Sequence, residues 1–361
     1  MNGEAVVLGF DTSCYTTSVA AVDLAGRPVA SCRRLLPVPS GERGLRQSEA
    51  VFIHVRQLPV LMEELAQRIR GCTIAAVCAS TQPRDEQGSY MPVFQAGDAQ
   101  ARGVAALLGV PCFASNHQRG HLEAAMVDSG VEPGALLALH LSGGTTELLA
   151  YDGERITLLG GSLDLHAGQL VDRVGVALGL PFPAGPHLEE LAVRGTSQAR
   201  LPVSMEQGGL YCHLSGAETQ LQRWITAGEM PAEHIAREAY DLLARTVARM
   251  VLAGARKTGL HQVLLAGGVA SSALFRELVI ARVAKQDRSL RLHFGRPEYS
   301  GDNAVGAARI GAKLLCAKNK EDEQPWLHNC WTEKPCPTNC GKSWPFGWKI
   351  SKRAALRQAL R

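Results

Sequence analysis

The stretch AVVLGFDTSCYTTSVAAVD, residues 5–23, contains two short apolar strands on either side of a polar turn that begins at Asp11. Residues 134–152, GALLALHLSGGTTELLAYD, repeat this arrangement without a gap at an offset of 129. Matching apolar positions are Leu8 with Leu137, Phe10 with Leu139 and Val19 with Leu148. Apolar strands around a Gly- or Asp-containing turn indicate hairpins. The repeat favours a duplicated fold in which each half offers one loop to a shared ligand; the alternative is a chance similarity between two hairpins.

Strands and helices alternate along the rest of the chain. Strands are predicted over residues 74–80, 111–115, 262–265 and 290–294. Helices are predicted over 48–70, with a break at Pro59, and over 98–108, 170–178, 232–257, 273–285 and 303–318. Such alternation is typical of α/β layers. The predicted domains are a first lobe over residues 1–115, a second lobe over 116–300, a returning helix over 301–317 and a tail over 318–361.

Composition and charge narrow the class of protein. A hydrophobic content of 46% is enough for a sizeable buried core. No apolar run is long enough to span a membrane, and the first residues lack the basic and apolar regions of a secretory signal. We therefore expect a cytoplasmic protein without a membrane partner. Seven of the ten cysteines lie among apolar or strand-like neighbours and indicate buried thiols more than a disulfide framework; they are Cys14, Cys32, Cys72, Cys78, Cys112, Cys212 and Cys316. The positive charge is concentrated in the Trp- and Cys-containing tail, which we expect to lie outside the core.

Two histidines, His117 and His121, are four residues apart in a segment that follows a predicted strand. On a helix this spacing places both side chains on one face, within reach of one ion. Ser115 or Asn116 could cap that helix. Gln118 stands where the zinc-protease pattern HExxH has its glutamate, so the sequence does not support hydrolysis by that route. The spacing alone is equally compatible with two ordinary core or surface histidines.

Asp302 lies in a turn that runs into the last predicted helix. An aspartate at such a position commonly caps the helix. It could instead point into a cleft as a metal ligand or as an acid beside a phosphate. Two histidines and one aspartate would leave coordination positions open for water or for a substrate oxygen.

Three glycine turns are candidates for contact with a nucleotide. Glycine lets the backbone approach phosphate or ribose closely, and a strand-to-helix turn directs N–H groups at an anion. The turns contain Ser142, Gly143 and Gly144; Gly185; and Gly267 and Gly268. Neither GxxxxGK[ST] nor GxGxxG occurs in the sequence, which argues against P-loop and Rossmann cofactor sites.

A series of motifs spans residues 7–312. They are LGFDTSC (8–14), NHQRGHLE (116–123), LSGG (141–144), Asp172 with GLP (179–181) and GP (185–186), LSG (214–216), GGVA (267–270) and GDNA (301–304). In this order they resemble the motifs of the TsaD family, also described as glycoprotein endopeptidases of peptidase family M22. Members of that family act as tRNA adenosine threonylcarbamoyltransferases.

The resemblance implies a fold and a set of site residues. The fold is the duplicated, two-lobed actin/Hsp70-like α/β fold (ASKHA, RNase H-like). A metal would be bound by His117, His121 and Asp302, with iron or zinc suited to this ligand set and magnesium possible with the nucleotide. Asp11, near that metal, is a candidate for orienting water or taking a proton. The implied contacts to ATP or to the substrate adenylate are His140, Leu141, Ser142, Gly143, Gly144, Asp172, Gly185, Gly267, Gly268 and Ser272.

The resemblance also implies an activity and partners. In the family, a separate enzyme makes threonylcarbamoyl-adenylate from threonine, bicarbonate and ATP. The TsaD-type protein then transfers the threonylcarbamoyl group to the exocyclic amine of the adenosine adjacent to the tRNA anticodon, as an N(6)-L-threonylcarbamoyladenine synthase. The implied partners are tRNA, the adenylate-forming enzyme and accessory subunits of a threonylcarbamoylation complex.

Several positions depart from the family pattern. The histidine of SGGHT is Thr145, the glutamate of GEAFD is Gln169, the lysine of SGLKT is Glu218, and the asparagine of GGVAAN is Ser272. These substitutions motivate a second hypothesis: a non-catalytic paralogue that binds a metal and a nucleotide and acts as a partner or regulatory subunit.

Overall fold

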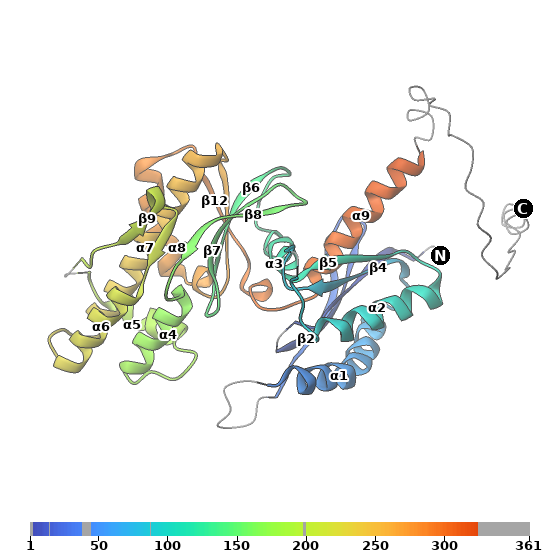
Figure 1. The fold of residues 1–361 in the computed structure, drawn as a ribbon, viewed down its shortest axis with the longest axis horizontal. Coiled ribbons are helices and arrows are strands. Elements are labelled where there is room, and N and C mark those ends of the chain that lie inside the picture. The colour runs from blue at the N-terminus through green and yellow to red at the C-terminus, as the bar shows by residue number, and fades with distance from the viewer. Residues whose placement is uncertain (1–2, 14, 38–44, 87, 198–199, 324–361) are drawn as a thin grey trace, which may run out of the picture. The chain divides into compact units, whose positions relative to one another are not determined.

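The computed structural model of the chain describes residues 3–13, 15–37, 45–86, 88–197 and 200–323. Most of the predicted tail lies outside these residues. Residues 1–319 form one compact unit, and residues 320–361 are grouped separately. Within the first unit the chain builds two mixed sheets with helices packed against them, as Figure 1 shows. The bounds predicted for the two lobes stay a prediction.

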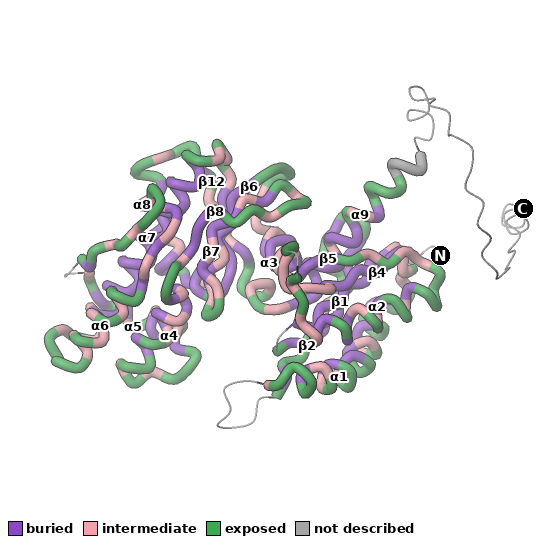
Figure 2. Tube along the Cα trace, viewed as in Figure 1, coloured by how far each residue is buried: buried purple, intermediate pink, exposed green. Residues whose placement is uncertain are grey.

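The first sheet has the strand order β3–β2–β1–β4–β5. Its strands are β1 (Ala5–Asp11), β2 (Thr16–Asp23), β3 (Pro28–Leu35), β4 (Thr73–Gln82) and β5 (Cys112–Asn116). Helices α1 (Gln47–Arg68) and α2 (Phe94–Leu108) pack on one face through an apolar cluster that includes Phe10 and Leu58. The other face, with Val7 and Val22, packs against α9 (Val305–Glu323). Helices on both sides explain why nearly all of β1 and β2 is buried, as Figure 2 shows.

The second sheet has the order β12–β11–β6–β7–β8–β10–β9. Its strands are β6 (Leu136–Leu141), β7 (Thr146–Tyr151), β8 (Ile156–Ser162), β9 (Ser204–Glu206), β10 (Tyr211–His213), β11 (Gln262–Ala266) and β12 (Arg291–Phe294). The main apolar cluster of the molecule joins one face of this sheet to five helices: α4 (Ala167–Ala177), α5 (Gly185–Arg194), α6 (Ser215–Ala227), α7 (Ala232–Thr258) and α8 (Ala273–Gln286). Helix α3 (His117–Ala125) packs on the opposite face through Leu122 and Ala125.

The internal repeat is confirmed at the level of strand register. Phe10 pairs with Val19 in the first hairpin, and the residues 129 positions later, Leu139 and Leu148, pair in the second. In both sheets the hairpin is extended by one more antiparallel strand on one side and by two parallel strands on the other. The chain therefore has the duplicated α/β architecture that the sequence predicts, with β9 and β10 added to the second copy.

Some local predictions were wrong. Helix α1 does not break at Pro59 but runs through it. Pro59 and Val55, whose carbonyl would accept the missing N–H bond, both lie on the exposed side of the helix, where water can take that place. Strands β3 and β8 were not predicted, because fewer than half of their residues are buried. Helices α5 and α6 were missed although their apolar residues recur at helical spacing.

Two further observations concern membrane-spanning helices and cysteines. Among the described residues no helix is long and apolar enough to cross a membrane. The described cysteines are free thiols; Cys32, Cys78 and Cys212 are buried as predicted, whereas Cys112 and Cys316 are exposed.

Candidate functional site

A cleft of 1210 Å³ opens beside the two hairpins. Residues of both sheets and of the segments that connect them contribute to its walls. The lining residues on which the argument depends are Tyr15, Arg33, Arg84, His117, Gln118, His121, His140, Ser142, Gly144, Glu147 and Asp302. The repeated loops of the two hairpins thus contribute to one space.

Helix α3 presents His117 and His121 to this cleft. The helix begins directly after β5, and the Asn116 side chain caps it by accepting a hydrogen bond from the Arg119 backbone N–H at 2.7 Å. The predicted cap is therefore Asn116. The four-residue spacing places the two imidazoles on one face, with ring centroids 4.3 Å apart.

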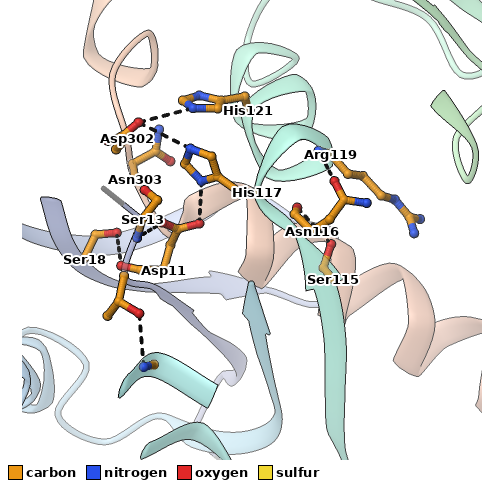
Figure 3. Close-up of polar contacts among 12 residues, drawn as sticks. Asp11, Ser13, Ser18, Ser115, Asn116, His117, Arg119, His121, Asp302 and Asn303 are labelled. Carbon is orange, nitrogen blue, oxygen red and sulfur yellow. Dashed lines mark hydrogen bonds and ion pairs between the residues drawn. The ribbon is translucent and has the colours of Figure 1, made fainter. Parts of the chain in front are cut away.

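Asp302 faces the two histidines and does not cap α9. Its Oδ1 lies 3.2 Å from His121 Nε2 and 3.5 Å from His117 Nε2, as Figure 3 shows. Asn303 occupies the capping position, since its side chain accepts from the Val305 N–H. One ligand atom from each of the three residues lies within 4.8 Å of the others. This set of two imidazole nitrogens and a carboxylate fits one divalent ion.

Asp11 lies behind His117. It is only 1% exposed, and its Oδ2 contacts His117 Nδ1 at 2.8 Å while its Oδ1 accepts from the Ser13 N–H. Holding Nδ1 in this way leaves Nε2 directed toward Asp302 and the cleft (Figure 3). A carboxylate that orients a ligating histidine through its other nitrogen is a common feature of metal sites.

The electrostatics of this cluster favour a positive charge between the carboxylates. Burial alone would lower the pKa of His117, but Asp11 and Asp302 raise it well above its ordinary value. Burial likewise acts to raise the pKa of Asp302, but the hydrogen bonds and charges of the two histidines hold it well below its usual range. A bound cation satisfies the same field without protons on the histidines, which supports the fit of the site to a metal.

His140 lies beside His121, and the centroids of the two imidazole rings are 5.1 Å apart. Burial lowers its pKa to about 3, and the neighbouring histidines act in the same direction. His140 is therefore neutral at physiological pH and can donate or accept a hydrogen bond without adding charge to the site.

Glu147 is a cleft residue that the sequence analysis missed. It pairs with His140 across the second hairpin, its Oε1 forms an ion pair with Arg84 at 2.7 Å, and its Oε2 accepts from Gln118 at 3.0 Å. The signal was present: Glu147 is the one charged side chain in the otherwise apolar and hydroxyl-bearing strand 146–151. Through Arg84, Glu147 ties the segment after β4 to the second hairpin.

A second pocket, of 410 Å³, adjoins the cleft at Ser142, which lines both. Three glycine turns meet here with residues of the helices α4, α5 and α7. Of the residues predicted to contact a nucleotide, those that line this pocket are Ser142, Gly143, Asp172, Gly185, Gly268 and Ser272. Gly144 and His140 line the cleft instead. We refer to this space, which we predict to hold a nucleotide, as the nucleotide pocket.

Two of the predicted contact residues line neither space. Leu141 is fully buried in the main core. Gly267 has a φ of +99°, and a Cβ at this position would lie 2.2 Å from the Leu141 carbonyl oxygen. Both residues support the loop from behind, and Gly267 is required by a left-handed backbone and a close approach together.

The substituted family positions have structural partners in this chain. The Gln169 side chain accepts from the His166 N–H at the start of α4, and Ser272 caps α8 by accepting from the Phe275 N–H. Glu218 accepts from Gln222 one turn later in α6. Each of these three substituted side chains therefore accepts a hydrogen bond within or at the start of a helix.

Gly168 gives a prediction about the nucleotide pocket. Its N–H donates to the Ser142 carbonyl, and a Cβ here would lie 2.6 Å from Gly143 N and from the Ser142 carbonyl carbon. Gly168→Ala is expected to displace the loop and to weaken nucleotide binding about tenfold, since overpacking costs about 1–3 kcal/mol. Titration calorimetry with ATP checks this. Gly103→Ala, in a helix with open space around the glycine, should leave affinity unchanged; equal affinity of both variants and the parent would contradict the assignment.

The family model and the sequence relatives agree on one family. Residues 43–309 match the family model TsaD, described as tRNA N6-adenosine threonylcarbamoyltransferase. A protein of that description from Aromatoleum aromaticum is 31% identical over 326 residues, covering 88% of this chain and 94% of the relative. A "probable bifunctional tRNA threonylcarbamoyladenosine biosynthesis protein" from Methanothermobacter thermautotrophicus is 31% identical over 307 residues, covering 84% of this chain and 55% of the relative.

Solved structures show the fold alone. HypF from T. kodakarensis superposes with a TM-score of 0.57 at 15% identity, over 89% of this chain and 49% of HypF. A second HypF structure, in its phosphate- and nucleotide-bound form, gives a TM-score of 0.55 at 11% identity, over 87% of this chain and 46% of HypF. The chain therefore spans about half the length of HypF and shares its architecture.

Proposed function

The chain belongs to the TsaD family of tRNA N6-adenosine threonylcarbamoyltransferases, and we propose that it transfers a threonylcarbamoyl group from threonylcarbamoyl-adenylate to the exocyclic amine of the adenosine adjacent to the anticodon of tRNA, in the cytoplasm. One observation carries this proposal. The nucleotide pocket adjoins, at Ser142, the cleft in which His117, His121 and Asp302 converge. An adenylate in the pocket would place its acyl phosphate at that junction.

The pocket supplies backbone groups and small side chains for the adenylate. Asp172 accepts from the Ala184 N–H at 2.9 Å and so fixes the turn before Gly185, while Tyr240 donates to the Gly185 carbonyl at 3.1 Å. These contacts hold the pocket in shape before ligand arrives, so little ordering is needed on binding. The glycines of the 142–144 and 267–268 turns allow phosphate to approach the backbone.

His117, His121 and Asp302 would hold one divalent metal, with iron or zinc favoured by the donor set and magnesium possible with the nucleotide. When bound, such an ion supplies Lewis-acid polarisation of carbonyl and phosphoryl oxygens. We assign Asp11 to positioning the His117 ring. Asp11 is 1% exposed, and its Oδ2 contacts His117 Nδ1 at 2.8 Å, which supports this assignment. A role for Asp11 in orienting water or taking a proton stays a prediction.

The proposed transfer is an acyl substitution. The exocyclic nitrogen of adenosine forms a bond to the carbamoyl carbon, the bond from that carbon to the adenylate phosphate oxygen breaks, and AMP leaves with the electron pair. His140, kept neutral by burial, can donate a hydrogen bond toward an oxygen in the cleft. The proton that the nitrogen loses passes to the water that the open cleft admits.

The wall of the cleft formed by Tyr15 and Arg33 suits an unstacked base and its phosphate. Tyr15 is 42% exposed, and base–aromatic stacking contributes about 1–3 kcal/mol. Tyr15→Ala is expected to raise the KM for tRNA about tenfold while leaving ATP affinity unchanged. Steady-state kinetics with varied tRNA check this, with Tyr90→Ala, an exposed tyrosine outside the cleft, as the matched control. An unchanged KM in Tyr15→Ala would remove the residue from the tRNA-binding surface.

The proposed function is tested by nucleoside mass spectrometry. Unmodified tRNA is incubated with the full chain, threonine, bicarbonate, ATP, an adenylate-forming enzyme and accessory subunits from a related system. Threonylcarbamoyladenosine should appear and should disappear when this chain is omitted. No product, while a family member of known activity succeeds in the same mixture, would overturn the proposal in favour of the non-catalytic partner.

A further inference from the structure

A third cavity, of 660 Å³, lies between α7 and α8 and shares no lining residue with the cleft or the nucleotide pocket. Its lining is dominated by positive side chains. The charged residues are Arg200, Arg245, Arg249, Arg282, Lys285 and Asp241. The two helices contribute all of them except Arg200, which precedes β9.

Two of these arginines, Arg245 and Arg282, form ion pairs with acids of α7, and we call them the floor arginines. Arg245 contacts Asp241 at 2.8 Å and the fully buried Glu238 at 3.1 Å, and it also donates to the Leu201 carbonyl. Arg282 forms an ion pair with the other oxygen of Asp241. The carboxylate of Asp241 therefore joins α7 to α8, and the two acids are already used in neutralising the two floor arginines.

The remaining cations, which we call the rim cations, form no ion pair with an acid among the residues that the structure describes. They are Arg200, Arg249 and Lys285, and all three are exposed. They come from three different segments, so no single helix explains their meeting. Like charges around one concave space repel each other, and a bound anion relieves that repulsion.

We propose that this cavity is a binding site for phosphate groups. Guanidinium groups match phosphate oxygens in geometry, and several cations at one rim suit a ligand with more than one negative charge. The lining has no aromatic side chain and only two small apolar ones, Ala248 and Ala281, so it offers nothing to a base or an acyl chain. The ligand is recognised by its phosphates alone.

Two sources can supply such phosphates: a free polyphosphate, or the backbone of the tRNA. The second source rests on the proposed function, because it takes tRNA to be the substrate. A contact in this cavity, which shares no lining residue with the cleft, would position the RNA without reading its sequence.

The test uses the full chain and two matched double variants. Arg249→Gln/Lys285→Gln removes two rim cations. Arg256→Gln/Lys257→Gln removes the same charge from exposed positions in the last turn of α7, outside the cavity. Binding of inorganic tripolyphosphate is measured by calorimetry, and binding of unmodified tRNA is measured over a series of salt concentrations.

The rim variant is expected to bind tripolyphosphate about tenfold more weakly than the control variant. If the RNA backbone is the ligand, tRNA affinity also falls and the slope of log K against log salt shrinks by roughly two. Weaker tripolyphosphate binding with unchanged tRNA binding identifies the free anion as the ligand, and a loss for tRNA alone identifies the backbone. Equal binding of both probes by rim and control variants would overturn the site. Because binding is measured, a failure of the transfer reaction leaves this result readable.

Discussion

Replacing His121 with alanine is expected to remove the bound metal and to lower the transfer rate about a thousandfold, with the fold intact. Loss of Lewis-acid stabilisation worth about 4 kcal/mol gives a decrease of this size. His121 Nε2 lies 3.2 Å from Asp302 Oδ1, and without it only one imidazole and one carboxylate remain. Such a pair holds a divalent ion poorly, since structural and catalytic sites usually have three or more protein ligands.

The measurement has two independent readouts. Metal content per chain is determined by plasma mass spectrometry after loading with iron or zinc, and the transfer rate is measured as product per unit time. His261→Ala, an exposed histidine outside the cleft, is the control and should match the parent in both. If His121→Ala retained the parent's metal content, the three residues would not be the metal site, whatever the activity did.

Replacing Glu123 with alanine is expected to reduce the free energy of unfolding by about 3–5 kcal/mol. Glu123 is fully buried on α3, and it accepts from Lys313 Nζ at 2.5 Å and from the Tyr151 hydroxyl at 2.7 Å. Arg309 Nε lies 3.5 Å from its second oxygen. Removing the carboxylate leaves the positive charge of Arg309 in a largely buried position with its main partner gone.

Urea denaturation of the single and double variants checks this. Lys313→Met alone should also be destabilising, by about 1–3 kcal/mol, because the fully buried Glu123 carboxylate loses its nearest cation while Arg309 and the Tyr151 hydroxyl still contact it. The double variant Glu123→Ala/Lys313→Met should be less destabilised than the sum of the two single changes, with a coupling of roughly 1–2 kcal/mol. Strict additivity would show that the pair does not interact, and a cost below about 1 kcal/mol for Glu123→Ala would contradict its role as the centre of the network.

The fold was predictable because its signal is carried by repeated local patterns. Two apolar hairpins with matching positions specify two copies of one sheet, and burial on both faces keeps those positions apolar. The pairing of Phe10 with Val19 and of Leu139 with Leu148 follows directly. Pro59 misled the prediction because it lies on the exposed side of the helix. The Val55 carbonyl, which lacks its N–H partner there, can accept a hydrogen bond from water.

The site was predictable where spacing within one element fixed geometry. His117 and His121 are neighbours on any helix, and Asp302 joins them only through tertiary structure, so its role needed the family resemblance or the coordinates. Glu147 was overlooked because its meaning depends on Arg84, which is 63 positions away. The cations between α7 and α8 were invisible for the same reason: no local pattern brings Arg200, Arg249 and Lys285 together.

The shared register of the two hairpins determines which side chains flank His117 and His121. Asp11 and His140 occupy the same position of the internal repeat, because they are 129 residues apart and the two hairpins have the same register. Helix α3 lies between them, with Asp11 against His117 and His140 beside His121. The two copies of the repeat therefore flank the histidine pair with one anionic side chain, Asp11, and one neutral side chain, His140. The asymmetry around the histidine pair therefore comes from the different side chain that each copy carries at this one position.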